Sequence, residues 1–181
     1  ETAGDMDAAV EFLRKNGQAK AEKKAGRIAA EGLCAVTLKD DKTAAVVEVN
    51  SETDFVAKNA TFQEFVNAVA AQAVNSDAAD LDAFMAEPWN EDSSKTVNDA
   101  LVEKVAVIGE NLKIRRFEKV AAENGCVVSY IHGGGRIGVI VEAETTAVND
   151  TVKEALTNIA MQIAALNPKY VSREEIPAEH I

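Results

Sequence analysis

The sequence predicts an α+β fold of two related subdomains, each a small antiparallel sheet with packed helices, preceded by an N-terminal helical remnant. Two observations predict this class. Short apolar runs at residues 33–38 and 43–50 flank a polar turn and lead into a helical pattern, which is typical of a hairpin followed by a helix. The same order begins again at residues 127–143. We expect the second subdomain to be incomplete, because too little chain follows it.

The composition restricts the class of partner. The 181 residues are enough for one or two compact domains, each with its own core. A net charge of −11 and a pI near 4.7 argue against direct binding to nucleic acid, which depends on Lys and Arg neutralising phosphates. We therefore expect a protein partner, and no cofactor.

The cysteines and the chain ends indicate the cellular compartment and whether the chain is a fragment. Cys34 and Cys126 lie too far apart in sequence to suggest a disulfide framework, so we expect buried thiols in a reducing compartment. No apolar run approaches the length of a membrane span, and the acidic start ETAGDMD is unlike a signal peptide. Because the chain lacks an initiator Met, we expect a fragment or a processed product.

Two helices are expected at the N-terminus. Residues 5–16 suit a short helix with Asp5 as N-cap and Gly17 as its stop. Residues 19–31 suit a second helix that carries several basic residues, among them Lys23 and Lys24. This second helix is either a solvated linker or a docking surface for an acidic partner helix.

A hairpin and a helix follow. Leu33–Leu38 and Thr43–Asn50 are expected to pair around the turn at 39–42, and the helix is expected over 61–74 with Thr61 as N-cap. The strand-to-helix loop between them carries Asp54 and Phe55, and such loops commonly hold binding residues on a rigid scaffold. An exposed Asp54-Phe55 tip would suit insertion into another protein. Alternatively, Phe55 and Val56 fold back and seal the base of the helix.

The first subdomain ends with three further segments. Residues 76–94 are polar and are expected to be irregular or partly helical. Residues 97–108 have helical spacing and are closed by Gly109. Residues 112–119 alternate as a strand whose inner face is ambiguous. The predicted order is therefore strand, strand, helix, helix, strand.

The second subdomain repeats the hairpin and the helix. Its strands are expected at 127–132 and 136–143 around the turn Gly133-Gly134-Gly135, offset by 93 residues from the first copy, while the helices align at an offset of 90. The loop before its helix reads Glu144-Thr145-Thr146-Ala147, so the special tip belongs to the first copy. An open sheet edge here could pair with another chain, which would make a homo-oligomer.

No enzyme active site is expected. The run HGGG at 132–135 joins two strands and has no nucleophilic Ser beside it, so it suits a flexible turn better than an oxyanion loop. It also lacks the GK[ST] ending of a phosphate-binding loop. His132 and His180 have no neighbours at zinc-ligand spacing, and Glu52 with Asp54 lacks the support that a catalytic acid pair needs. A small hydrolase would require a nucleophile that the sequence does not offer.

Four stretches that together span nearly the whole chain carry a family resemblance. They are EVNSETDFVAK from Glu48, VEKVAVIGENLKIRRF from Val102, SYIHGGGRIGV from Ser129 and IAMQIAALNP from Ile159. In this order they resemble elongation factor Ts, the guanine nucleotide exchange factor of elongation factor Tu. The resemblance implies translation elongation as the process and the cytoplasm or an organelle matrix as the location.

The resemblance also implies a domain organisation. Residues 1–31 would hold the last helix of an N-terminal three-helix module plus a linker helix, 32–121 the first core subdomain, and 122–181 the second, incomplete one. Each core subdomain would contain an antiparallel three-stranded sheet. The rest of the module, a helical hairpin and the last elements of the second subdomain would lie beyond this chain.

The resemblance assigns the exchange mechanism to the tip. Thr53, Asp54, Phe55 and Val56 match the residues that wedge between helices of the partner's nucleotide-binding domain near its magnesium site. The ion is displaced, the phosphate-binding loop rearranges and GDP leaves; GTP rebinding then expels the factor. An alternative within the family is a module that binds the partner without promoting exchange.

A second grip on another domain of the partner is implied as well. Its residues match two places, the second hairpin and the end of the last helix: His132, Gly133, Ile137, Gly138, Met161, Gln162 and Ile163. Gln162 stands where many members of the family carry His. Lys23 and Lys24 match a basic stretch near the partner.

Overall fold

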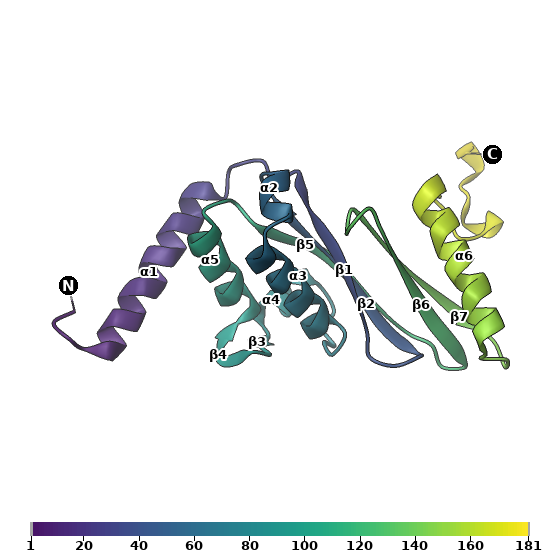
Figure 1. Ribbon diagram of the computed structural model, residues 1–181, viewed down its shortest axis with the longest axis horizontal. Helices are drawn as coiled ribbons and strands as arrows, with labels where there is room; N and C mark the ends of the chain where they lie inside the picture. Colours follow the sequence, from purple (N-terminus) through teal and green to yellow (C-terminus); the bar gives the residue numbers. More distant parts are fainter. Residues whose placement is uncertain (1, 181) are drawn as a thin grey trace.

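The computed structural model describes residues 2–180 and arranges them in four layers (Figure 1). One helix, with a second packed beside it, covers one face of a three-stranded sheet. A two-stranded hairpin lies against the other face, and a last helix covers the hairpin. The predicted α+β class with small antiparallel sheets is confirmed. The elements are α1 (Met6–Lys24), β1 (Glu31–Leu38), β2 (Thr43–Ser51), α2 (Asp54–Ala57), α3 (Ala60–Ala73), α4 (Leu81–Ala86), β3 (Pro88–Trp89), β4 (Asp92–Thr96), α5 (Val97–Ile108), β5 (Lys113–Ala121), β6 (Gly125–His132), β7 (Ile137–Glu144), α6 (Asp150–Leu166), η1 (Arg173–Glu175) and η2 (Ala178–His180).

The N-terminal segment is one helix, so the prediction of two helices separated at Gly17 is wrong. Asp5 caps α1 as predicted, accepting a hydrogen bond from Ala8 N at 3.0 Å. The helix continues through Gly17, which is buried, because this residue lies where α1 crosses α5. A Cβ at Gly17 would lie 3.8 Å from Val102 Cγ1. Gly17 therefore lies inside the helix at its contact with α5 instead of ending it, and a Cβ there would make an ordinary contact.

The first sheet has the order β1-β2-β5 with antiparallel pairing throughout. The predicted hairpin is confirmed, and Asp40 closes its turn by accepting hydrogen bonds from Lys42 N at 2.8 Å and Thr43 N at 2.7 Å. The pairing of β2 with β5 slips by one residue beside Glu48. The slip explains the ambiguous pattern of β5, because Ile114 before it and Phe117 after it both contact the core although their spacing is odd.

The largest core lies between this sheet and helices α3 and α5. Buried apolar residues of β2 and α3, such as Val47 and Phe62, form its centre. Asn59, and not the predicted Thr61, caps α3, because its side chain accepts from Thr61 N at 2.9 Å. The segment predicted to be partly helical contains the short helix α4 and the ribbon β3-β4, whose Trp89 is 5% exposed and packs against Phe65 with ring centroids 5.9 Å apart.

The second hairpin packs on the opposite face of the sheet. Its turn approaches β1 so closely that Cys34 N donates a hydrogen bond of 2.7 Å to Gly135 O. A Cβ on Gly138 would lie 3.0 Å from both Cys34 Cβ and Val46 Cγ2. Glycine in the turn and in β7 therefore lets the two β layers touch.

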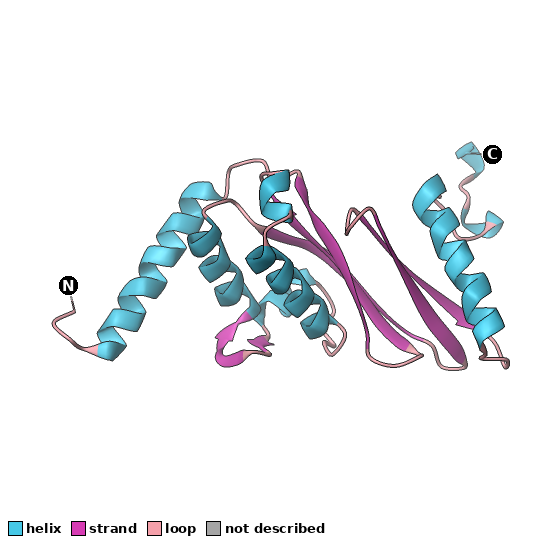
Figure 2. Ribbon diagram, in the orientation of Figure 1, coloured by secondary structure: helices cyan, strands magenta, loops and turns pink. Residues whose placement is uncertain are grey.

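The hairpin-helix unit occurs twice, as the sequence predicted. Helix α6 lies across β6 and β7 in the same way that α3 lies across β1 and β2 (Figure 2). The second unit is smaller: within residues 2–180 its sheet has two strands, and only the short turns η1 and η2 follow α6.

Candidate partner-binding surface

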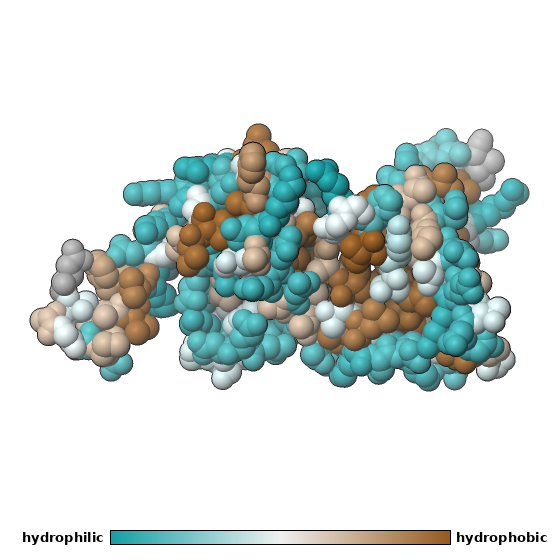
Figure 3. Space-filling model, viewed as in Figure 1, coloured by the Kyte–Doolittle hydropathy of each residue, from teal (hydrophilic) through white to brown (hydrophobic). Residues whose placement is uncertain are grey.

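The predicted tip is a single turn of helix at the end of β2. Thr53 precedes α2 and its side chain accepts a hydrogen bond from Val56 N at 3.4 Å. Phe55 is 80% exposed, whereas Val56 packs against the core. Figure 3 shows apolar surface projecting above α2. The folded-back alternative therefore holds for Val56 but not for Phe55.

A charged side chain stands beside the exposed ring. Asp54 forms an ion pair of 2.7 Å with Lys58 one turn later. The hydrogen bond from Lys58 lowers the pKa of Asp54 below its ordinary value. The tip thus presents an ionised carboxylate next to an aromatic ring.

The base of the tip is held from the connection between α5 and β5. Glu110 accepts hydrogen bonds from Glu52 N at 3.0 Å, from Thr53 N at 3.1 Å and from Thr53 Oγ1 at 2.6 Å. Both oxygens of its carboxylate are engaged. These contacts join segments that lie almost sixty residues apart in sequence.

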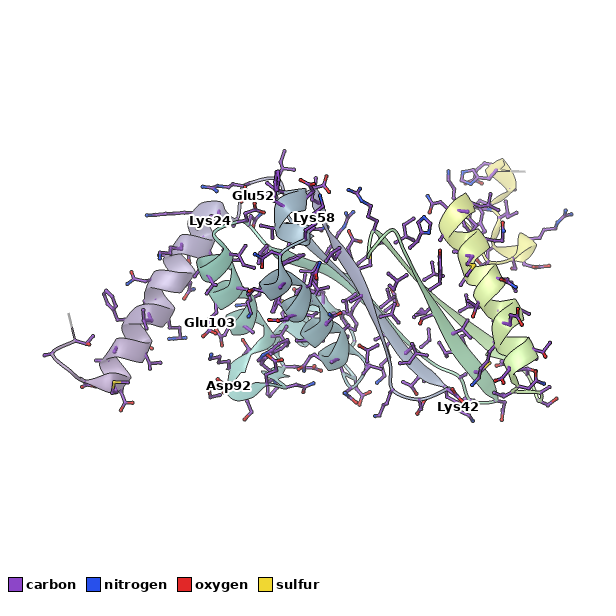
Figure 4. The ribbon with its side chains drawn as sticks, viewed as in Figure 1. Lys24, Lys42, Glu52, Lys58, Asp92 and Glu103 are labelled. Carbon is purple, nitrogen blue, oxygen red and sulfur yellow. The ribbon has the colours of Figure 1, made fainter. Side chains whose placement is uncertain are left out.

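Further contacts bind the same loop to the connection between α1 and β1. Glu52 accepts a hydrogen bond from Asn111 N at 2.6 Å and lies 3.6 Å from the guanidinium of Arg27. Asn111 Nδ2 donates to Arg27 O at 2.7 Å. Figure 4 labels Glu52 at this junction. Sequence reasoning missed these roles, because no periodicity indicates that a residue after a helix will bond a distant loop.

The first part of the predicted second grip lies at the turn between β6 and β7. His132, Gly133 and Ile137 are exposed. The His132 ring is held by its neighbour, since Nδ1 lies 2.8 Å from the hydroxyl of Tyr130. Gly138 is only half-buried, although it contacts β1 and β2.

The second part lies near the C-terminal end of α6. Met161 and Gln162 are exposed, while Ile163 is half-buried. Ile163 lines an open cleft of about 570 Å³ between this helix end, β1 and β7, together with Ile137 and Gly138. The structure therefore brings these three predicted residues together. Met161 and Gln162 lie with Leu166 on an adjoining apolar surface, and Ile163 belongs to both.

All these groups lie along one edge of the molecule. In Figure 1 the upper edge carries, in order, the C-terminal end of α1, the tip helix α2, the turn between β6 and β7 and the end of α6. Lys24 and Lys58 are on this edge in Figure 4, and Lys42 lies at the opposite one. Lys23 is exposed and Lys24 half-buried in the last turn of α1.

Metal-ligating side chains and the Cys34 thiol are two further kinds of functional group. Between residues 2 and 180 there is no group of three His, Cys, Asp or Glu side chains that could hold a metal ion. Cys34 lines the cleft, but burial raises the pKa of its thiol, which disfavours the nucleophilic thiolate. None of the helices in this part of the chain is long and apolar enough to cross a membrane.

Comparison with known proteins gives a consistent result. A family model described as Elongation factor TS matches residues 52–181. Over the whole chain the sequence is 50% identical to elongation factor Ts of Halothermothrix orenii and 52% identical to that of Clostridioides difficile. Over 99% of the chain it is 48% identical to that of Trichlorobacter lovleyi. The chain spans 59–60% of the length of these relatives.

Proposed function

The chain belongs to the elongation factor Ts family, and from this premise we propose that it binds elongation factor Tu carrying GDP and promotes release of the GDP during translation elongation. In this proposal it forms no covalent bond with a substrate and is an exchange factor, not an enzyme. Its proposed setting is the cytoplasm or an organelle matrix.

The exposure of Phe55 is the observation that carries the proposal. A large aromatic side chain that is 80% exposed at the tip of a fixed turn gains free energy when a partner buries it. Asp54 beside it adds a negative charge that suits a site near a bound cation. This combination fits a wedge that enters the partner near its magnesium ion.

The proposed mechanism is a competition between two ligands of the same partner. Phe55 and Asp54 enter between helices of the nucleotide-binding domain, the magnesium ion is displaced and GDP leaves. Linkage requires reciprocity: if the factor loosens the nucleotide, the nucleotide loosens the factor by the same free energy. Rebinding of GTP then expels the chain.

The tip needs a second contact to act. Burying Phe55 contributes roughly 1.5 to 3 kcal/mol, whereas shifting a two-state equilibrium by about ten thousand-fold requires about 5.5 kcal/mol. We assign the remainder to the grip residues on the same edge of the molecule, among them Ile137, Gly138 and Ile163 around the cleft and the exposed His132 and Met161. Lys23 and Lys24 would add a weaker electrostatic contribution.

The experiment is stopped-flow release of a fluorescent GDP from elongation factor Tu as the chain is titrated in. We expect release to accelerate with concentration, and Phe55→Ala to lower the maximal rate by at least about tenfold, because the lost burial is about 1.5 kcal/mol or more. Phe12→Ala is the matched control, since this partly exposed phenylalanine lies on α1 away from the tip.

Each outcome has a separate meaning. A large loss of melting temperature in Phe55→Ala with unchanged release would contradict the wedge and indicate a core role. Measurable binding without acceleration would favour the alternative of a partner-binding module that does not promote exchange.

A further inference from the structure

We propose that Glu110 is a positioning residue that holds the tip helix α2 in its projecting orientation. The inference rests on the proposed exchange function and extends it to a residue outside the tip. Glu110 follows Gly109, which ends α5, and it has no predicted contact with the partner. It would act on exchange through Thr53 and not by touching the nucleotide site.

The tip helix cannot hold its own orientation. It has four residues, and an isolated helix of that length is unstable because the free-energy cost of nucleation exceeds the stabilisation from one hydrogen-bonded turn. Within the tip, Val56 packs against the core and Ala57 is buried, but Phe55 is 80% exposed and the Asp54 side chain is 42% exposed. Gln63 Nε2 also holds the end of the turn by donating to Ala57 O at 3.3 Å, and Ser51 Oγ donates to Thr53 O at 3.1 Å. The backbone N–H groups at the start of the turn still need an acceptor.

Glu110 fixes that start with three hydrogen bonds to two consecutive residues. Oε2 accepts from Glu52 N and Thr53 N, and Oε1 accepts from Thr53 Oγ1 at 2.6 Å. Bonds to an ionised acceptor are shorter and stronger than neutral ones. Because the two amides are adjacent, their shared acceptor determines the direction in which the chain leaves β2.

The contact is reciprocal, which makes it rigid. The Glu52 carboxylate accepts from Asn111 N at 2.6 Å, so each of the two loops supplies a carboxylate to the backbone of the other. Asn111 Nδ2 in turn donates to Arg27 O, three residues after the end of α1. The tip is thereby connected to α1, α5 and β5 through side chains, in addition to its continuity with β2.

This arrangement predicts a particular kinetic signature. Without Glu110 the tip would occupy its productive orientation for only part of the time, and the apparent affinity falls by the populated fraction. The bound complex, once formed, still contains Phe55. Loss of Glu110 should therefore raise the half-saturating concentration, whereas loss of Phe55 should lower the maximal rate.

The variants separate geometry from charge. Glu110→Gln can keep the arrangement, because its amide oxygen can accept from both backbone N–H groups while its NH₂ donates to Thr53 Oγ1. Glu110→Ala removes all three of these bonds. Thr53→Val removes the hydroxyl's bond to Glu110 and the one it accepts from Val56 N, while leaving the backbone bonds. Glu103→Ala is the matched control: this glutamate is on α5 near its pair Lys95, away from Glu52 in Figure 4.

The first measurement is GDP release from elongation factor Tu against the concentration of each variant. For Glu110→Ala we expect the half-saturating concentration to rise about tenfold, with the maximal rate within about twofold of the unsubstituted chain. Glu110→Gln should restore most of the loss, and Glu103→Ala should change neither value. An unchanged half-saturating concentration in Glu110→Ala would overturn the proposal.

The second measurement tests the contact without any partner. Amide hydrogen exchange followed by NMR should show faster exchange at Glu52 and Thr53 in Glu110→Ala, with protection of the β1-β2-β5 sheet retained. If Glu110→Ala does not fold, Thr53→Val takes its place and should accelerate exchange at the same two amides. Protection lost uniformly over the sheet, or no change at these amides, would show that Glu110 does not position the tip.

The two measurements keep the proposals distinguishable. If the unsubstituted chain does not accelerate GDP release, the proposed function fails. The amide exchange at Glu52 and Thr53 then still decides whether Glu110 fixes α2.

Discussion

At the scale of single residues, Glu48 shows how a local irregularity creates an ionic site. The register slip between β2 and β5 puts two successive arginines beside one carboxylate, with Arg116 Nε at 2.7 Å and Arg115 Nη1 at 3.3 Å. The Glu48 side chain is 17% exposed and also accepts from Asn50 Nδ2 at 3.2 Å. Burial acts to raise the pKa of Glu48, but the hydrogen bonds from Asn50 and Arg116 outweigh it, and the pKa is lowered.

This lowered pKa predicts a contribution of Glu48 to stability that depends on pH. A carboxylate with a folded pKa below its ordinary value of 4.5 stabilises the protein above that pH, and the contribution is lost as pH falls through the folded pKa. We expect the melting temperature of the unsubstituted chain to fall more steeply below pH 4.5 than that of Glu48→Gln. Thermal melts across the acid range check this.

Glu118→Gln provides the control for this prediction. Glu118 is on the same strand as the two arginines but is exposed, and no ion pair to it is present among the described residues. Its acid profile should follow that of the unsubstituted chain. Equal slopes for Glu48→Gln and the unsubstituted chain would contradict the assignment.

At the scale of elements, the crossing of α1 and α5 yields a prediction about Gly17. Glycine costs about 1 kcal/mol relative to alanine inside a helix. A Cβ at this position would make ordinary contacts, 3.8 Å from Val102 Cγ1 and 3.9 Å from Ala106 Cβ. We therefore expect Gly17→Ala to raise the free energy of unfolding by about 0.5 to 1 kcal/mol, measured by urea denaturation.

A larger side chain at the same position gives the opposite result. Gly17→Leu should destabilise the protein, because its branches would collide with α5 and push α1 away. If Gly17→Ala were also destabilising, the close approach of the helices would be tighter than the contact distances indicate.

The sequence predicted the helices and strands better than their boundaries and the contacts between them. Both hairpins, the helix over residues 97–108 and the repeat follow from periodicity and turn residues, and all are present. The prediction that Gly17 ends a helix was wrong because glycine has this role where the backbone turns left-handed, as at Gly109 with φ of +88°. The sequence pattern cannot distinguish that case from a glycine inside a helix at a contact with another helix. The slip beside Glu48 was hidden because one extra residue reverses which side chains face inward.

The candidate site was predictable only in part. Spacing placed Phe55 and Val56 in the correct loop but could not decide between exposure and burial, and the structure divides the two. The base of the tip is held from residues 110–111, a contact that is set by tertiary packing and has no local pattern. The partner-binding roles of the tip and of the second grip stay predictions.

At the scale of the whole molecule, the contact between the two β layers sets where the second hairpin lies relative to the first sheet. The position of the second grip relative to the tip therefore depends on this contact. The turn of the second hairpin lies against β1, where Gly135 O accepts from Cys34 N. A Cβ on Gly135 would lie 2.9 Å from Leu33 Cδ2 and 3.2 Å from Cys34 O. Gly134, the preceding residue in the turn, has nothing within 4 Å of such a Cβ.

These two glycines can be compared to test the contact between the two β layers. Both have positive φ, +67° at Gly134 and +101° at Gly135, so alanine is strained at either position. Only Gly135→Ala also pushes against β1, and we expect it to cost about 1 to 3 kcal/mol more than Gly134→Ala. Urea denaturation of the two variants checks the difference. Equal losses in the free energy of unfolding would mean that the turn does not hold the two β layers together.

Tryptophan and tyrosine lie in different halves of the molecule, so their intrinsic fluorescence can report on the unfolding of each half without a label. Trp89, the one tryptophan in the sequence, is enclosed beside Phe65 on the α3 side of the first sheet. Both tyrosines, Tyr130 and Tyr170, belong to β6 and to the segment after α6. Selective excitation of tryptophan therefore follows unfolding of the half that carries the tip, while the tyrosine signal follows the half that carries the second grip.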